Sequence, residues 1–327
     1  MNLSPNVLRL DPKAEVAKIV AVIRQHVRKD LRRRGAVLGL SGGIDSSVSA
    51  ALCARAFGPG HVFGLFMPET ESSGDSLNLG RLLAESLGIP SGLEDITAAL
   101  NGARCYERRD ESIRKVVPEY GPGWKCKIVL PGMLAESPYA IFSIVVQSPE
   151  GAQSKTRLTA EAALGIVAAT NFKQRVRRMM EYYHADRLNY AVVGTPNRLE
   201  YDQGFFVKNG DGAADFKPIA HLYKTQVYQL AEYLEVPEAI RRRPPTTDTY
   251  SLEQTQDEFF FSLPLDKLDL CLWGLNHGFS PDKAAPAVGL TPAEMERVYA
   301  QIKARRRATR SLHLRPLLVE EVKEIHP

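Results

Sequence analysis

The sequence predicts an α/β fold, in which a doubly wound parallel sheet is covered by helices on both faces and carries one inserted hairpin subdomain. Short apolar runs typical of buried strands alternate with amphipathic helical segments along most of the chain. Strands joined by helices in this way pair in parallel and are covered on both sides, which is why their sequences are apolar throughout. Because 327 residues suffice for one large domain, we expect residues 1–327 to form a single unit.

The first elements follow one another from the amino terminus. Asp11 and Pro12 combine a helix N-cap with a proline at the first helical position, and apolar residues then recur at helical spacing. An apolar run after Gly35 predicts the first buried strand. The predicted elements are a helix from 12 to about 35, a strand over 36–40, a helix over 48–57, a strand over 61–67 and a helix over 76–87.

Segment 101–158 breaks this alternation. It is punctuated by glycine and proline, and two stretches at 127–130 and 139–147 are strand-like. Because connections between strands and helices are ordinarily a few residues long, we expect an inserted hairpin subdomain or lid here. The alternation resumes with a helix over 171–186, a strand over 190–193, a helix over 222–234 and a last helix from 291 to about 306.

Composition excludes several classes of protein. Hydrophobic residues make up 44% and charged residues 24%, which argues against a disordered or fibrous chain. The sequence contains no apolar run of about 18 residues that would predict a membrane span, and no signal peptide. Four cysteines without CxxC pairing favour a reduced, cytoplasmic protein. The mild basic excess, 42 Lys and Arg against 38 Asp and Glu, lacks interleaved aromatic residues, so we expect an anionic small molecule rather than nucleic acid as the partner.

The most informative segment is the loop after the first predicted strand, LGLSGGIDSS at 38–47. Gly42 and Gly43 allow the backbone to come close to an anion, so that its N–H groups and the next helix start can face a phosphate. The P-loop pattern ending in Gly-Lys-Ser/Thr is absent, so the loop has no lysine for a transferring γ-phosphate. Asp45 stands there instead, and because a carboxylate repels phosphate unless a cation lies between them, the loop predicts Mg²⁺.

Residues 41–47 resemble the pyrophosphate loop of the ATP pyrophosphatases, which split ATP into AMP and pyrophosphate while activating an acid. Further segments resemble those of one family in this group, the NAD synthetases. The resemblance implies a Rossmann-like ATP-pyrophosphatase fold and covers roughly residues 15–100 and 165–315. The matching segments are NFKQR at 171–175, GTPNRLE at 194–200, GFFVKNGDGAAD at 204–215, LYKTQ at 222–226 and PTTD at 245–248.

The resemblance implies a role for single residues at the matching positions. Asp45 and Glu200 are expected to hold Mg²⁺ on the phosphates of ATP, the co-substrate. Asp211 and Lys224 are the expected catalytic residues, with Asp211 taking a proton from ammonia or ammonium. The residues expected to bind ATP are Gly39, Leu40, Ser41, Gly42, Gly43, Ile44, Asp45, Ser46, Ser47, Thr195, Lys224 and Thr246. The residues expected to bind the acid substrate are Asn171, Arg175, Lys208, Asp215 and His313.

The reaction that the resemblance implies has two steps. A substrate carboxylate attacks the α-phosphate of ATP, and ammonia then attacks the acyl-adenylate to release AMP and leave an amide. In the family the acid is deamido-NAD and the product is NAD. Leu314 stands where the family commonly carries a lysine after the histidine at 313, and segment 101–158 precedes the acid-recognising helix. Two alternatives therefore stay open: a paralogue that amidates another acid, such as nicotinate mononucleotide, and a non-catalytic nucleotide-binding module.

The source of nitrogen is predicted from chain length and cysteine context. Too little chain precedes Ala36 for a glutaminase domain, and none of the cysteines has a recognisable catalytic setting; they are Cys53, Cys105, Cys126 and Cys271. We therefore expect free ammonia, or a separate glutaminase subunit, to supply the nitrogen. The resemblance also implies a homodimer.

Overall fold

The computed structural model describes residues 3–129, 142–246, 250–252 and 263–325. Its central feature is a four-stranded parallel sheet with the strand order β3-β2-β1-β7, which confirms the predicted α/β fold. The chain adds β2 and β3 on one side of β1 and β7 on the other, so the strand order reverses at β1. Ligands of open α/β sheets bind at such a reversal, beyond the carboxyl ends of the strands. The strands are β1 (Ala36–Gly39), β2 (Val62–Phe66), β3 (Ser91–Leu93) and β7 (Ala191–Val192).

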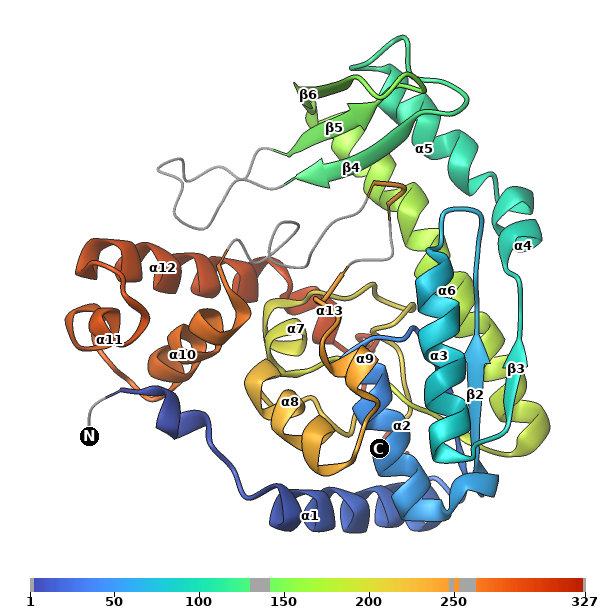
Figure 1. Ribbon diagram of the computed structural model, residues 1–327, viewed down its shortest axis with the longest axis vertical. Helices are drawn as coiled ribbons and strands as arrows, with labels where there is room; N and C mark the ends of the chain where they lie inside the picture. Colours follow the sequence, from blue (N-terminus) through green and yellow to red (C-terminus); the bar gives the residue numbers. More distant parts are fainter. Residues whose placement is uncertain (1–2, 130–141, 247–249, 253–262, 326–327) are drawn as a thin grey trace.

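Both faces of this sheet are covered by helices, as Figure 1 shows for α3 and α6 beside β2. Neighbouring side chains of a strand point to opposite faces. Ala36 and Leu38 belong to the main core, whereas Val37 packs in a smaller core with Ala185 of α6 (Ala160–Leu188). The main core also takes side chains from α1 (Pro12–Arg24), η2 (Gln25–Asp30), α2 (Ile44–Phe57), α3 (Gly74–Leu87), α8 (Lys224–Tyr233) and α9 (Glu238–Arg241).

A second, helical core lies beside the sheet, on the left of Figure 1. Its helices are α10 (Leu265–Asn276), α11 (Pro281–Val288) and α12 (Pro292–Ala308), and η1 (Pro5–Leu8) packs against them. Thr291 caps α12 as its sequence predicts, with its side chain accepting the N–H of Glu294. Two further short helices are α7 (Arg198–Gln203) and α13 (Arg310–His313). A short 3-10 turn, η3 (Pro59–His61), precedes β2 of the parallel sheet.

Segment 101–158 contains an antiparallel sheet with the order β4-β5-β6, at the top of Figure 1. The structure adds a third strand to the expected hairpin and a helix before it. The elements of this region are α4 (Thr97–Gly102), α5 (Cys105–Arg114), β4 (Lys125–Val129), β5 (Ser143–Gln147) and β6 (Gln153–Arg157). Residues 130–141, which include part of both expected strands, lie outside the described residues. The function of this segment as a lid stays a prediction.

The largest difference in an element's bounds concerns α6, which begins at Ala160 rather than near 171. Thr159 caps it, and its first turns pack against α5 and the antiparallel sheet. Gly165 allows the close approach of the two helices, because a Cβ at this position would collide with the side chain of Ser112. Although α6 has 29 residues, neither it nor any other described helix is long and apolar enough to cross a membrane.

Candidate active site

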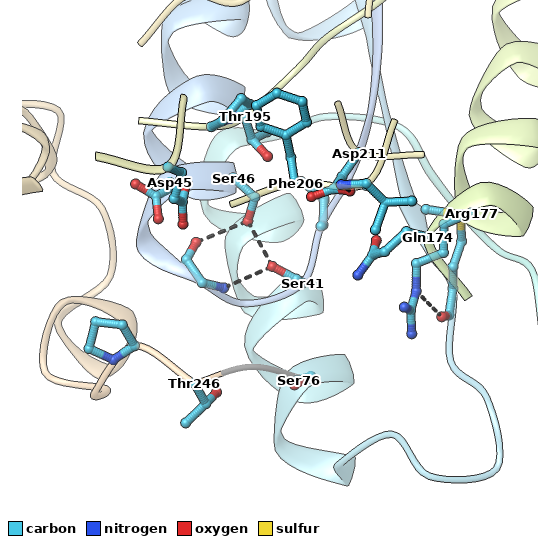
Figure 2. Close-up of a pocket in the computed structure, with 18 of the residues that line it drawn as sticks. Ser41, Asp45, Ser46, Ser76, Gln174, Arg177, Thr195, Phe206, Asp211 and Thr246 are labelled. Carbon is cyan, nitrogen blue, oxygen red and sulfur yellow. Dashed lines mark hydrogen bonds between the residues drawn. The ribbon is translucent and has the colours of Figure 1, made fainter. Parts of the chain in front are cut away.

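A cavity of about 530 Å³ opens at the carboxyl ends of β1, β2 and β7. Figure 2 shows Ser41, Asp45 and Ser46 on one side of it and Gln174, Arg177 and Asp211 on the other. The first group follows β1 directly, and the second comes from α6 and a turn near residue 211. The cavity therefore lies where the reversal of strand order predicts a ligand.

The phosphate loop occupies the β1 side of the cavity and leads straight into α2. Ser46 and Ser47 donate hydrogen bonds to the Gly43 carbonyl at 2.9 and 2.8 Å, and Ser41 accepts the N–H of Gly43. Gly42 has a φ of +71°, and a Cβ there would meet α3. Of the expected ATP residues in this loop, Gly42 and Ser47 lie outside the cavity wall, whereas Gly39, Leu40, Ser41, Gly43, Ile44, Asp45 and Ser46 line it.

A buried lysine, Lys224, lies beside the two expected metal ligands, Asp45 and Glu200. Lys224 is only 2% exposed, and its Nζ forms an ion pair with the Asp45 carboxylate. Glu200 also faces this ammonium. Burial alone would lower the pKa of Lys224, but the Asp45 and Glu200 charges outweigh it and raise that pKa. Asn197 donates a hydrogen bond to Asp45 over 3.1 Å and its backbone N–H to Glu200, so that one residue orients both carboxylates.

The donor set of Asp45 and Glu200 fits Mg²⁺. Mg²⁺ is usually held by one or two protein carboxylates, with phosphate oxygens and water completing its coordination. In the part of the chain that the structure describes, no group of three or more His, Cys, Asp and Glu side chains could hold a metal alone. The two carboxylates therefore suit an ion that arrives with a nucleotide.

Asp269, which the sequence does not single out, supports the position of Lys224. Its carboxylate is fully buried and accepts the N–H groups of Lys224 and Thr225, at 3.2 and 2.8 Å, at the start of α8. Burial raises the pKa of Asp269 to about 6, although both hydrogen bonds oppose this. The carboxylate fixes the helix start and so places the Lys224 side chain beside Asp45. The only signal for it in the sequence is an aspartate placed between Leu268 and Leu270 in an apolar helix.

Arg243 is a second residue that the sequence does not single out. It lies beyond α9 in a basic cluster, yet its guanidinium lines the cavity and donates a hydrogen bond to Ser76 over 3.1 Å. Thr195, after β7, and Thr246 also line the cavity, as expected for ATP-binding residues. The rest of the PTTD segment, Thr247 and Asp248, lies outside the described residues.

Asp211 is held in the turn that faces the phosphate loop across the cavity. Its Oδ1 accepts the N–H of Val207 over 2.8 Å. Burial raises the pKa of Asp211, while the Val207 hydrogen bond and the Arg178 charge act in the opposite direction. A carboxylate with a raised pKa is a stronger base, as a proton acceptor requires.

The residues expected to bind the acid are divided between two places. Asn171 lines the cavity, together with Gln174 and Arg177 of the same helix. The other four lie outside the cavity wall on exposed surface. Arg175 donates to the Lys208 carbonyl over 3.3 Å, and Lys208 donates to the carbonyl of Ser311. His313 packs edge-on against Tyr201 and Phe206, and Asp215 accepts the N–H of Val192.

Comparison with known proteins agrees with this geometry. The sequence profile of the NAD synthase family matches residues 15–116 and 140–310. The chain is 62% identical over 322 residues to the NH(3)-dependent NAD(+) synthetase of Rhizobium meliloti, covering 98% of this chain and 96% of that protein. In structure it is similar to an NH3-dependent NAD synthetase from Campylobacter jejuni, at 24% identity with a TM-score of 0.61, covering 95% of this chain and all of that one. An NMN synthetase from Francisella tularensis gives a TM-score of 0.60 at 22% identity, covering 95% and 99%.

The two structural similarities show a shared fold, and the sequence similarity shows descent. Matches over nearly the whole length of both chains leave no large part of either unaligned. The chain belongs to the NAD synthase family.

Proposed function

We propose that the chain is an ammonia-dependent NAD synthetase, which converts deamido-NAD, ATP and ammonia into NAD, AMP and pyrophosphate. The observation that carries this is a cavity with a phosphate loop on one side and a half-buried proton acceptor, Asp211, on the other. The 62% identical relative bears the same activity in its name. The likeness to an NMN synthetase, at 22% identity, supports the fold but does not favour nicotinate mononucleotide as the acid.

In the first step the phosphate-loop side binds ATP so that its inner anhydride is attacked. The N–H groups after β1 and the start of α2 face the phosphates, and Ser41 and Ser46 add hydroxyl donors. Lys224 and Arg243 bring positive charge from α8 and from the segment after α9. These groups stabilise the departing pyrophosphate. Asp45 and Glu200 would hold Mg²⁺, which when bound neutralises charge on the phosphates.

In the second step ammonia captures the acyl-adenylate. The attacking nucleophile is neutral ammonia, whereas ammonium predominates at neutral pH, so a nearby base increases the rate. Asp211 is the base, because its carboxylate lines the cavity and burial raises its pKa. AMP then leaves with its carboxylate-derived oxygen, and the acid keeps the new amide nitrogen.

The cysteines argue against a glutaminase nucleophile within this chain. All four are buried free thiols, and burial raises the pKa of both Cys53 and Cys271 to about 12. A thiol of this kind is a poor nucleophile, because thiolate is the reactive form. Free thiols also suit a reducing compartment, so we propose that the enzyme works in the cytoplasm, on free ammonia or with a separate glutaminase subunit.

A homodimer is proposed on the family resemblance and on the surface of α6. Met179 and Tyr183 are large apolar side chains, one turn apart on this helix, that are more than half exposed. Grouped apolar exposure favours contact with another protein surface.

An end-point assay with two acids tests the proposal. The chain is incubated with ATP, Mg²⁺ and ammonium chloride, and with either deamido-NAD or nicotinate mononucleotide. We expect NAD, AMP and pyrophosphate in equal amounts from deamido-NAD, and no NAD when glutamine replaces ammonium. Release of ADP and orthophosphate would overturn the proposal. Turnover with nicotinate mononucleotide alone would favour the paralogue, and turnover with neither acid would favour a non-catalytic module.

A further inference from the structure

Two oppositely charged residues of α6 form a buried pair in the cavity wall. Arg178 and Glu181 are one turn apart on the helix, and their Nη1 and Oε2 atoms are 2.5 Å apart. Both side chains are less than a tenth exposed. Neither residue belongs to the segments that the family resemblance assigns to ATP, metal or acid.

Arg178 ties two loops of the active site together. Its guanidinium donates to the carbonyl of Val193 at the end of β7, over 3.2 Å, and to the carbonyls of Gly210 and Asp211, over 3.1 and 3.4 Å. Because a planar guanidinium carries several donors in a fixed arrangement, it fixes the relative position of these carbonyls. The Asp211 turn is thereby held against the strand that leads to Thr195.

Glu181 extends the connection to the phosphate loop. Its Oε1 accepts the N–H of Gly39 over 3.0 Å, at the point where β1 ends. Through the ion pair with Arg178, one helix therefore holds the start of the phosphate loop and the Asp211 turn. Burying two charges costs desolvation energy, and packed apolar side chains can often replace such a pair without loss of stability. Stability alone is thus a weak reason for a charged pair at this position.

We propose that Arg178 and Glu181 are positioning residues for the amidation, which hold the phosphate loop and the Asp211 turn at one fixed separation. The adenylate formed at the phosphate loop must react with ammonia before water reaches it. A fixed separation keeps the proton acceptor beside the site where the adenylate forms. The inference rests on the function proposed above.

The pair also sets the charge around Asp211. The groups that face its carboxylate electrostatically are Arg177, Arg178, Glu181 and Lys217. Arg178 favours the ionised form of Asp211, whereas Asp211 raises the pKa of Glu181. The pair therefore interacts with the Asp211 carboxylate electrostatically as well as through the hydrogen bonds of Arg178.

Arg178→Lys tests the geometry, because one ammonium keeps the charge but cannot reach three carbonyl oxygens as the guanidinium does. We expect NAD formation to fall by about ten- to a hundredfold, with KM for ATP within about threefold of the wild-type value. AMP should exceed NAD, because water intercepts adenylate that ammonia does not capture in time. Amide exchange at 210–213 should also become faster, which is a readout that needs no turnover.

Glu181→Gln tests the ion pair, because the amide oxygen can still accept the Gly39 N–H but no longer carries the charge that faces Arg178. We expect AMP to exceed NAD, as in Arg178→Lys. Glu94→Gln is the matched control, since Glu94 pairs with His184 of the same helix at 2.7 Å, outside the cavity wall, and its loss should leave AMP and NAD equal.

Two results would overturn this proposal: wild-type rates, stoichiometry and exchange in Arg178→Lys, or equal amounts of AMP and NAD from Glu181→Gln. A fall in melting temperature with unchanged turnover per folded molecule would also overturn it, because the pair would then be structural only. Failure of the proposed function looks different. It would appear as absence of NAD from the wild-type chain itself, whereas the amide exchange would still report whether Arg178 holds the Asp211 turn.

Discussion

The phosphate-loop side of the cavity comes from one continuous stretch of chain, whereas the opposite side is assembled from α6 and a turn more than thirty residues further on. A continuous loop keeps its geometry in its own backbone, so a short motif is enough to predict it. The opposite side depends on which face of a 29-residue helix turns inward. Asn171 faces the cavity, and Arg175, one turn later, lies outside its wall. A sequence motif therefore predicts the structure of a loop more directly than it predicts which face of a helix lines a cavity.

We expect the largest loss of activity from a substitution on the phosphate-loop side of the cavity. Asp45→Asn preserves size but removes one of the two carboxylates that face Lys224. We expect kcat/KM to fall by about a thousandfold, or about 4 kcal/mol, measured by pyrophosphate release with deamido-NAD. Asp75→Asn, at an exposed position in the first turn of α3, is the control and should retain activity. Undiminished turnover of Asp45→Asn would contradict the role assigned to this loop.

We expect the second largest loss of activity from a substitution on the opposite side of the cavity. Asp211→Asn removes the proton acceptor, so NAD formation should fall about a hundredfold. Exchange of labelled pyrophosphate into ATP, which reports the first step alone, should persist in the presence of deamido-NAD. Equal loss of both activities would show instead that Asp211 supports the whole cavity. Asp186→Asn, at an exposed position near the end of α6 and outside the cavity wall, is the control and should retain both activities.

A smaller effect is expected from Arg175, which lies on the exposed surface beside the cavity. If the dinucleotide extends beyond the cavity onto Arg175 and Lys208, Arg175→Ala should raise KM for deamido-NAD about tenfold, or about 1.4 kcal/mol. KM for ATP should not change. Arg187→Ala, at an exposed position on the same helix, should leave both values unchanged. An unaltered KM for deamido-NAD in Arg175→Ala would remove Arg175 from the acid-binding residues.

The smallest effect concerns stability rather than turnover. The pKa of Asp269 is about 6 in the folded protein and about 3.8 when unfolded, so the folded state binds more protons between these values. The contribution of Asp269 to the free energy of unfolding should therefore fall as the pH rises from about 4 to about 6, and Asp269→Asn should lack this contribution. Denaturant unfolding at several pH values measures the difference between the two proteins. Parallel curves would show that Asp269 is not held protonated by burial.

Much of the fold could be predicted because β1 and β2 are short apolar runs followed by glycine-containing turns and helices. The strand β6 could not, because its sequence, QSKTR, is polar and shows no apolar alternation. The early start of α6 was missed because it depends on contact with α5 at Gly165 and Ser112, which no local pattern reports.

In the candidate site, too, residues that look alike in the sequence differ in their tertiary contacts. Arg241, Arg242 and Arg243 are identical neighbours in sequence, yet only the last lines the cavity. Arg241 donates to the carbonyl of Val236, and Arg242 pairs with Glu238. The direction of each side chain depends on how the segment after α9 passes over Ser76 and the phosphate loop. Tertiary contacts of this kind select one arginine out of three.

The buried ammonium of Lys224 affects the stability of the protein when no metal ion is bound. Two carboxylates would repel each other in a partly dry pocket, and many metal-dependent folds loosen when their ion is withdrawn. Here a side chain of the protein itself supplies the compensating charge. Chelating agents should therefore stop turnover while leaving the melting temperature unchanged, as expected if magnesium enters with the nucleotide in each catalytic cycle and is not a structural component.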